Sequence, residues 1–178
     1  MAKKTTKSLV LSAIFLALGL CLPFLTGQMK ELGDSLLPMH LPVLLCGLFC
    51  GPYWGGFVGF ILPFLRSILF GMPPIYPQAV WMSLELFTYG FCIGLLYRRK
   101  ENPGLGHLYT SLLISMLSGR VVWGLAKTVL LGLSGKSFTF YAFLVGGFLD
   151  AFPGILLQLI LIPLIVGLYR IYQGGNEL

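Results

Sequence analysis

Six ionisable side chains lie inside long apolar stretches of this 178-residue sequence, where a charge is costly. In lipid such groups pair with one another or line a polar cavity, and they commonly mark a functional site. The six residues are His40, Arg66, Glu85, Arg120, Lys127 and Asp150. Counting helical rise from the ends of the stretches places all six at the middle or on one side of the membrane. The sequence therefore predicts a solute site that opens outward and is closed on the cytoplasmic side.

Two of the stretches carry charged and aromatic residues at helical spacing, so that each set would line one helix face. The sets are Trp81, Glu85 and Tyr89, four residues apart, and Arg120, Trp123 and Lys127, at intervals of three and four. Charges interleaved with flat rings suit a small aromatic or conjugated solute that carries hydroxyl or charged groups. Gln158, near the middle of the last apolar stretch, would complete the floor of the site.

A structural role for these charges is the alternative interpretation. Arg120 or Lys127 would then pair with Glu85 or Asp150 to hold helices together. The clustering of six charges at one depth favours the binding interpretation, because helix pairing alone does not require it. His40 fits either role equally well, as a ligand-binding group or as a satisfied helix-contact residue.

The composition shows which elements must position these residues. Hydrophobic residues make up 57% of the chain and charged residues 10%, with a mean hydropathy of +0.89, which is far more apolar than a soluble domain. A bilayer core about 30 Å thick needs roughly 20 residues per helix. We therefore predict an all-α membrane protein with six transmembrane helices in a single domain, residues 1–178. The expected spans are about 8–25, 36–50, 53–70, 79–97, 108–131 and 140–169.

The turn signal Gly51-Pro52 separates the second and third spans, because a helix interior tolerates it poorly. The positive-inside rule supports this division. With six spans the N-terminal lysines, the basic loop at residues 98–100 and Arg170 all face the cytoplasm, whereas five spans would put the basic loop outside. Both termini are thus expected to be cytoplasmic in a multi-pass protein of the cell membrane. The last span is long enough to need a tilt, or a kink at Pro153 or Pro163.

Glycines recur at four-residue spacing, which lets helix backbones approach closely in a membrane. They are Gly51, Gly55 and Gly59 in one stretch and Gly90 and Gly94 in another. Packing within the chain is the expected role, and docking of a partner helix is the alternative.

Other features exclude several functions. The net charge of +6 is not gathered in a basic patch with aromatics, so no nucleic-acid partner is expected. The cysteines lack metal-site spacing, and Gly135-Lys136-Ser137 lacks the glycine that a phosphate-binding loop needs at position 130. We expect no catalytic residues, metal or cofactor. An intramembrane enzyme using Glu85 or Asp150 as acid or base, and an ion-coupled transporter, are the alternative classes.

Three segments resemble the substrate-binding S components of energy-coupling factor (ECF) transporters. They read LPMHLPVLLCG at 37–47, GPYWG at 51–55 and GMPP at 71–74. Chain length, six spans and a polar loop after the first span fit the same family. Ala13 and Ala17 match the alanine motif with which the first helix of that family docks to the coupling subunit.

The resemblance implies a division of labour. Such a chain binds one vitamin in an outward-facing pocket, which the loop after the first span closes. It then topples in the membrane on docking to the transmembrane coupling subunit EcfT, which two cytoplasmic ATPases, EcfA and EcfA′, drive. ATP is used by those partners, and this chain holds no cofactor. The expected partners are therefore this module, a small-molecule vitamin and the lipid bilayer.

Three shorter segments resemble the branch of the family assigned to vitamin B6 compounds. They are TGQ at 26–28, MH at 39–40 and RVVWG at 120–124. Pyridoxine is a small aromatic zwitterion, which mixed charges and rings would complement. Pantothenate, whose carboxylate suits Arg120 or Lys127, and hydroxymethylpyrimidine are the alternatives.

Overall fold

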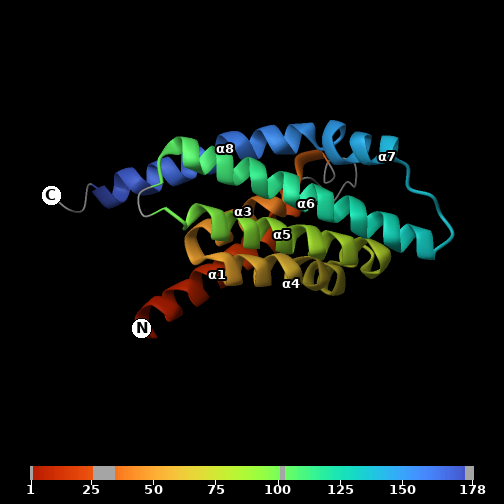
Figure 1. The fold of residues 1–178 in the computed structure, drawn as a ribbon. Coiled ribbons are helices and arrows are strands. Elements are labelled where there is room, and N and C mark those ends of the chain that lie inside the picture. Colours follow the sequence, from red (N-terminus) through yellow and green to blue (C-terminus); the bar gives the residue numbers. More distant parts are fainter. Residues whose placement is uncertain (1, 26–34, 101–102, 175–178) are drawn as a thin grey trace.

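The computed structural model describes residues 2–25, 35–100 and 103–174, and the regular elements in these ranges are helices that form a bundle (Figure 1). The α-helices are α1 (Ala2–Leu25), α3 (His40–Cys50), α4 (Pro52–Phe70), α5 (Val80–Tyr97), α6 (Leu105–Leu133), α7 (Phe140–Leu144) and α8 (Phe152–Gly174). Two short segments, η1 (Ile75–Ala79) and η2 (Val145–Leu149), precede α5 and α8; η2 is a single π-helical turn, whereas η1 contains Tyr76 in an extended conformation. The prediction of an all-α fold is confirmed.

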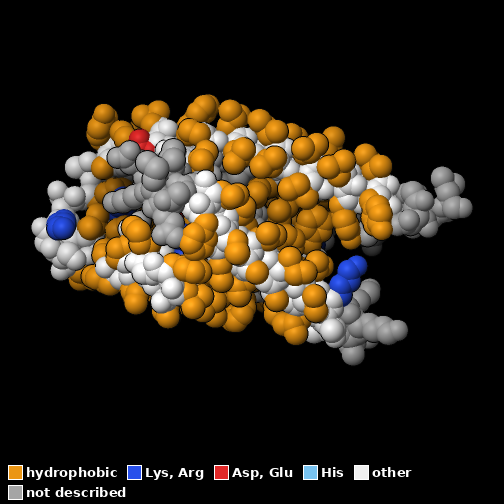
Figure 2. Space-filling view, turned by 180° about the vertical axis from the view of Figure 1, so that it is seen from behind, with side chains coloured by type: hydrophobic (Ala, Val, Ile, Leu, Met, Phe, Trp, Pro, Cys, Tyr) orange, Lys and Arg blue, Asp and Glu red, His pale blue; other side chains and the backbone are white. Residues whose placement is uncertain are grey.

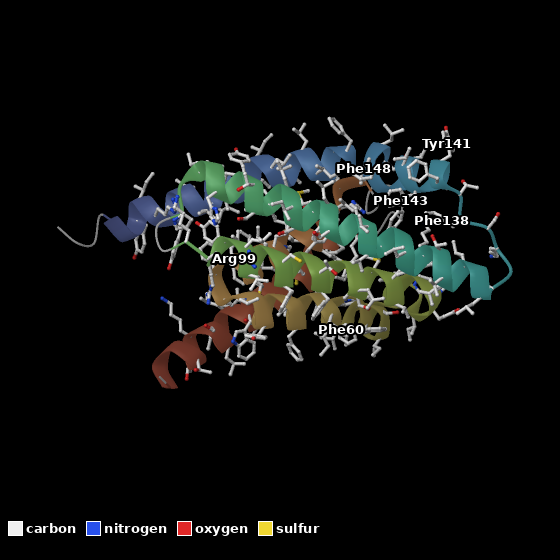
Figure 3. All side chains as sticks on the ribbon, viewed as in Figure 1. Phe60, Arg99, Phe138, Tyr141, Phe143 and Phe148 are labelled. Atoms are coloured by element: carbon white, nitrogen blue, oxygen red, sulfur yellow. The ribbon has the colours of Figure 1, made fainter. Side chains whose placement is uncertain are left out.

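Three arginines gather at one end of the bundle. The start of α1 and the end of α8 lie at the same end, where Arg99 also lies (Figures 1 and 3). Here Arg98 donates a hydrogen bond to the carbonyl of Phe49 at the end of α3, and Arg170 donates one to the hydroxyl of Tyr97. We call this end the basic end and the opposite one, where α4 and α6 finish, the distal end. The sequence predicts that these basic residues face the cytoplasm, because lysine and arginine concentrate in cytoplasmic loops.

Five helices in the described part of the chain are long and apolar enough to cross a membrane. They span Thr5–Leu25, Pro52–Phe70, Ile75–Tyr97, Leu105–Leu133 and Phe152–Tyr172. Apolar side chains cover most of the bundle surface on the face seen in Figure 2, while the clearly visible basic groups lie toward its two ends. The chain is therefore a multi-pass membrane protein.

The prediction of six spans is not confirmed. The second expected span is α3, whose 11 residues cover roughly 16 Å, about half of a bilayer core. It starts late because Leu37 has a positive φ of 50° and a turn follows at residues 38–39. The last expected span is divided into α7, η2 and α8, with a turn at residues 150–151 just before Pro153, whereas Pro163 lies inside α8.

The division at Gly51-Pro52 is confirmed. α3 ends at Cys50, Gly51 adopts φ = 100°, which a residue with a side chain would rarely accept, and Pro52 begins α4. Proline suits this position because the first backbone N–H of a helix has no partner within the helix.

The glycines pack helices against one another within the chain. A Cβ atom on Gly90 would lie 2.2 Å from the carbonyl oxygen of Gly55, and one on Gly59 would lie 2.3 Å from that of Leu86. Such distances leave no room for any side chain, so the backbones of α4 and α5 are in direct contact. This contact fixes the part of α5 that carries Glu85. For these glycines the expected role in packing is confirmed.

α3 lies inside the bundle, in contact with α1, α4, α5 and α8, and α5 lies between α4 and α6. One apolar cluster, which we call the central core, joins α3, α5, α6 and α8. Its buried members are Leu44, Leu45, Leu48, Tyr89, Ile93, Leu108, Leu112, Met116, Ile162 and Val166. A second apolar cluster joins α1, α3, α4 and α5.

Candidate functional site

Each of the four helices that form the central core carries a buried polar residue four positions from a core residue. The pairs are His40 and Leu44 on α3, Glu85 and Tyr89 on α5, Arg120 and Met116 on α6, and Gln158 and Ile162 on α8. Residues four apart share a helix face. Because α3, α5 and α8 run toward the basic end and α6 runs away from it, all four polar residues lie on the distal side of the core. We call these four residues the polar layer.

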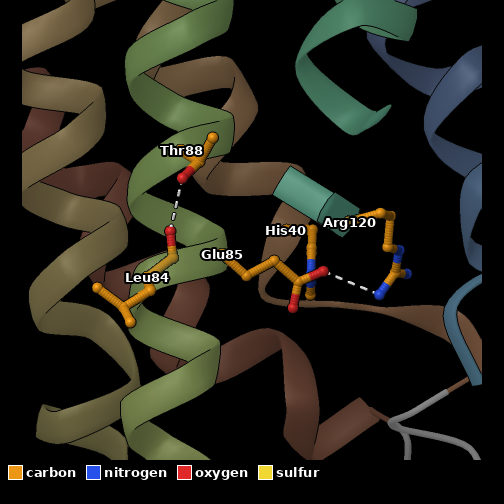
Figure 4. Close-up of polar contacts among 5 residues, drawn as sticks. All are labelled: His40, Leu84, Glu85, Thr88 and Arg120. Atoms are coloured by element: carbon orange, nitrogen blue, oxygen red, sulfur yellow. Dashed lines mark hydrogen bonds and ion pairs between the residues drawn. The ribbon is translucent and has the colours of Figure 1, made fainter. Parts of the chain in front are cut away.

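Glu85 is the centre of the contacts in the polar layer. Its Oε1 accepts a hydrogen bond from Arg120 Nη1 at 2.8 Å, and His40 Nε2 lies 3.4 Å from the same oxygen (Figure 4). The ring of Tyr89 meets that of His40 edge-on at 5.1 Å. An acid and a base on adjacent helices thus neutralise each other in a buried setting, which is how membrane helices tolerate charge.

The ion pair leaves much of the polar layer unsatisfied. In the described part of the chain, the buried side-chain nitrogen and oxygen atoms without a hydrogen-bond partner all belong to three of its members. They are Nδ1 of His40, Nε and Nη2 of Arg120, and Nε2 and Oε1 of Gln158, while His40 Nε2 has only the 3.4 Å contact with Glu85 Oε1. Each such atom costs about 1–3 kcal/mol, and folded proteins rarely leave buried polar atoms unpaired. The polar layer therefore has the donors and acceptors that a polar solute would satisfy.

An aromatic cage lies distal to the polar layer and surrounds Lys127. The Lys127 Nζ lies 4.5 Å from the ring centre of Trp123, 4.9 Å from that of Phe138 and 5.4 Å from that of Trp81. Arg120 also lies over the Trp123 ring, at 5.8 Å. Cations at these distances from aromatic faces are attracted by the ring quadrupole. The cage, defined as Trp81, Trp123 and Phe138, is thereby continuous with the polar layer.

The sequence did not identify Phe138 and Phe143 as neighbours of this site. Both pack against Trp123, with ring centres 5.8 and 6.1 Å away, and Figure 3 shows them near α7. Phe143 rests on α6 at Gly124, where a Cβ atom would lie 2.5 Å from its ring. The phenylalanine-rich run at residues 138–148 was the available signal. It has no helical spacing that links it to the charged residues.

Most of the residues predicted for the site come together. Glu85, Tyr89 and Trp81 on α5 face Arg120, Trp123 and Lys127 on α6, as their spacing predicts, and His40 joins them from α3. Gln158 belongs to the polar layer, as described above. The structural alternative is also realised in part, because Arg120 pairs with Glu85.

Arg66 and Asp150 depart from the prediction. Arg66 is buried on the side of α4 that faces α1, where it donates a hydrogen bond to the carbonyl of Leu20 at 2.9 Å and lies over the rings of Phe24 and Phe70. The prediction grouped Arg66 with the other site residues by its depth in the membrane, but Arg66 lies on the face of α4 that packs against α1. Asp150 is exposed in the turn between η2 and α8.

Ala13 and Ala17 are exposed on α1. The buried residues Ser12 and Gly19 lie on another face of α1, which packs against the bundle. The two alanines are therefore accessible to a partner helix. Residues 26–34, which contain the TGQ segment and were predicted to form a loop, lie outside the described residues.

The described residues include no group of three or more His, Cys, Asp or Glu side chains that could hold a metal ion. The cysteines are free thiols, and Cys46 Sγ contacts Ser12 Oγ at 3.6 Å. The polar layer itself offers hydrogen-bond donors, acceptors and charged groups.

A helical membrane bundle with polar groups buried in its middle is typical of membrane proteins that carry a functional site between their helices. The model of a family described as "ECF transporter, substrate-specific component" matches residues 7–166. The chain belongs to this family. Its members are transporter subunits rather than enzymes, and they work with a module of EcfT and ATPases. Searches of curated proteins and of solved structures gave no match.

Proposed function

We propose that this chain captures a vitamin at the polar layer and delivers it to the ECF module. The solute enters from the distal end, which faces outward if the basic end is cytoplasmic. With α3 counted as a short second span, the chain crosses the membrane six times and both termini are cytoplasmic.

The observation that carries the proposal is the set of unpartnered buried atoms on His40, Arg120 and Gln158. Helix pairing would satisfy the polar groups it buries, because each one left unpaired is destabilising. A solute that supplies the missing partners removes this cost on binding. The site is thus suited to reversible capture.

Vitamin B6 compounds are the first candidates for the substrate. A pyridine ring with hydroxyl groups can stack near Trp123, accept hydrogen bonds from Arg120, and both donate to and accept from the Gln158 amide. The segments that resemble the B6 branch of the family support this choice. Pantothenate and hydroxymethylpyrimidine are the alternatives.

Delivery depends on α1. The exposed alanines Ala13 and Ala17 let the backbone of a partner helix approach closely, which is how small residues promote helix association in membranes. In this proposal the chain topples on docking to EcfT, and the partner ATPases supply the energy.

Native mass spectrometry of protein purified from cells, followed by extraction of the bound small molecule, tests the capture function. We expect an unmodified vitamin on the wild type and little or none on Arg120→Ala. Thr88→Val is the control, because the Thr88 hydroxyl bonds only to its own helix at Leu84 in Figure 4, and it should retain the vitamin. A chemically altered product with turnover would instead support an enzyme. A wild type that binds nothing from a mixture of water-soluble vitamins would reject capture.

A further inference from the structure

The guanidinium group of Arg120 bonds to Glu85 through one nitrogen, Nη1, and leaves the edge formed by Nε and Nη2, which we call the open edge, without a hydrogen bond. Its Nη1 bonds to Glu85 Oε1 at 2.8 Å, whereas Nε and Nη2 have no hydrogen-bond partner among the described residues. The residue is 4% exposed, so water does not solvate this edge freely. In a planar guanidinium the Nε–H and one Nη2–H point in the same direction, which makes the open edge a pair of parallel donors.

Two parallel N–H donors select a particular acceptor. They match a group whose two oxygens lie side by side, and bonds of this kind are strongest when the group carries negative charge. A ligand group with a single acceptor leaves one of the two Arg120 donors unsatisfied. A ligand group with a donor beside its acceptor places that donor against the second N–H of Arg120. Glu85 is held on the other side of the guanidinium, so it keeps the open edge oriented without filling it.

Gln158 adds a second point of contact at the same level of the bundle. Its side chain is 1% exposed, and both amide atoms are without a partner in the described part of the chain. An amide that offers one donor and one acceptor adapts to a hydroxyl group on the solute. The paired donors of Arg120 therefore set the class of ligand, and Gln158 accommodates its substituents.

We propose that the open edge of Arg120 binds an oxyanion of the substrate together with a second acceptor oxygen beside it. This inference rests on the proposed function and narrows its substrate class. Two candidate vitamins carry such a pair. Pantothenate has it in its carboxylate, and zwitterionic pyridoxine has it in the deprotonated 3-hydroxyl oxygen beside the oxygen of the 4-hydroxymethyl group. Hydroxymethylpyrimidine lacks it, because an amino group stands beside its hydroxymethyl group.

Calorimetric titration with matched ligands tests this inference. Pantothenate is compared with pantothenol, which has an alcohol in place of the carboxylate, and pyridoxine with 4-deoxypyridoxine, which lacks the second oxygen. In one of the two pairs, we expect the vitamin to bind the wild type roughly 10- to 100-fold tighter than its analogue, because the analogue loses a hydrogen bond to the charged Arg120 guanidinium. The pair that shows the preference identifies the source of the oxygens.

Arg120→Lys keeps the charge and removes the parallel donors. It should weaken binding of the preferred vitamin by roughly 10- to 100-fold and reduce the preference within the pair. Arg66→Lys is the matched control, because Arg66 is also buried but lies between α1 and α4, and it should retain the preference. The wild-type comparison decides the question even if Arg120→Lys fails to fold.

Several results would overturn the inference while leaving the transporter role intact. They are equal binding within both pairs, an unchanged preference in Arg120→Lys, or hydroxymethylpyrimidine as the vitamin bound and taken up. A wild type that binds no vitamin would instead reject the proposed function, and the inference would fall with it.

Discussion

Gln158 is almost completely buried, yet neither atom of its amide has a partner among the described residues. A residue kept for stability would not be placed in this way, because an unpaired buried amide is destabilising. At the scale of single residues, stability and binding therefore make opposite demands on this position.

Gln158→Leu separates the two demands. Leucine has a similar volume and no polar atoms, so the thermal midpoint of the solute-free protein in detergent should rise or stay the same. Affinity for the vitamin should fall by roughly tenfold or more, because the hydrogen bonds to the amide are lost. Thermal unfolding and calorimetry measure the two effects. A lower midpoint with unchanged affinity would show that Gln158 is structural.

Glu85→Gln should lower both the thermal midpoint and the affinity for the vitamin, because it leaves the Arg120 guanidinium buried without its counter-charge. Removing one partner of a buried ion pair costs about 3–5 kcal/mol. In the double variant Glu85→Gln/Arg120→Gln the uncompensated charge is gone, so stability should largely recover while vitamin binding stays weak. Recovery of binding in the double variant would contradict the assignment of Arg120 to the solute.

The contacts within the site were predictable where residues share a helix face. The spacing of Trp81, Glu85 and Tyr89 and of Arg120, Trp123 and Lys127 predicted which side chains meet across α5 and α6. The position of Arg66 was not predictable, because depth along a helix does not say which neighbour its face meets. Only the packing of α1 on α4 shows that Arg66 bonds to Leu20.

At the scale of elements, the direct contact between α4 and α5 holds Glu85 in place. Gly90→Ala should disrupt this contact, since the new methyl group would lie 2.2 Å from the carbonyl oxygen of Gly55. Overpacking of this kind costs about 1–3 kcal/mol. Gly132→Ala is the matched control on α6, where a Cβ atom meets nothing within 4 Å. Thermal unfolding should show destabilisation in the first variant alone. Equal midpoints would mean that the backbones are not packed as described.

The extent of the elements was only partly predictable. Gly51-Pro52 marked the end of α3 because backbone geometry at glycine and proline is a local property. The late start of α3 follows the positive φ of Leu37 and the turn at residues 38–39, and α8 begins after the turn at 150–151; hydropathy does not report either turn. A continuous apolar run therefore overstated the length of both helices.

At the scale of the whole molecule, capture and delivery use different surfaces. The polar layer lies inside the bundle, whereas Ala13 is exposed on α1. Ala13→Trp should leave calorimetric affinity unchanged and abolish most uptake by the assembled transporter, because a large side chain keeps the partner helix at a distance. Leu125→Trp, at an exposed position on α6, is the control and should support normal uptake. Normal uptake by Ala13→Trp would remove α1 from the docking surface.

The most direct test of the account is a density map of the protein purified with its vitamin. We expect the solute between α6 and α8, with oxygens at about 2.7–3.2 Å from Arg120 Nε and Nη2 and a further contact to the Gln158 amide. A solute bound elsewhere, or a map in which other side chains of the chain already satisfy these atoms, would contradict the proposal that the polar layer captures the vitamin.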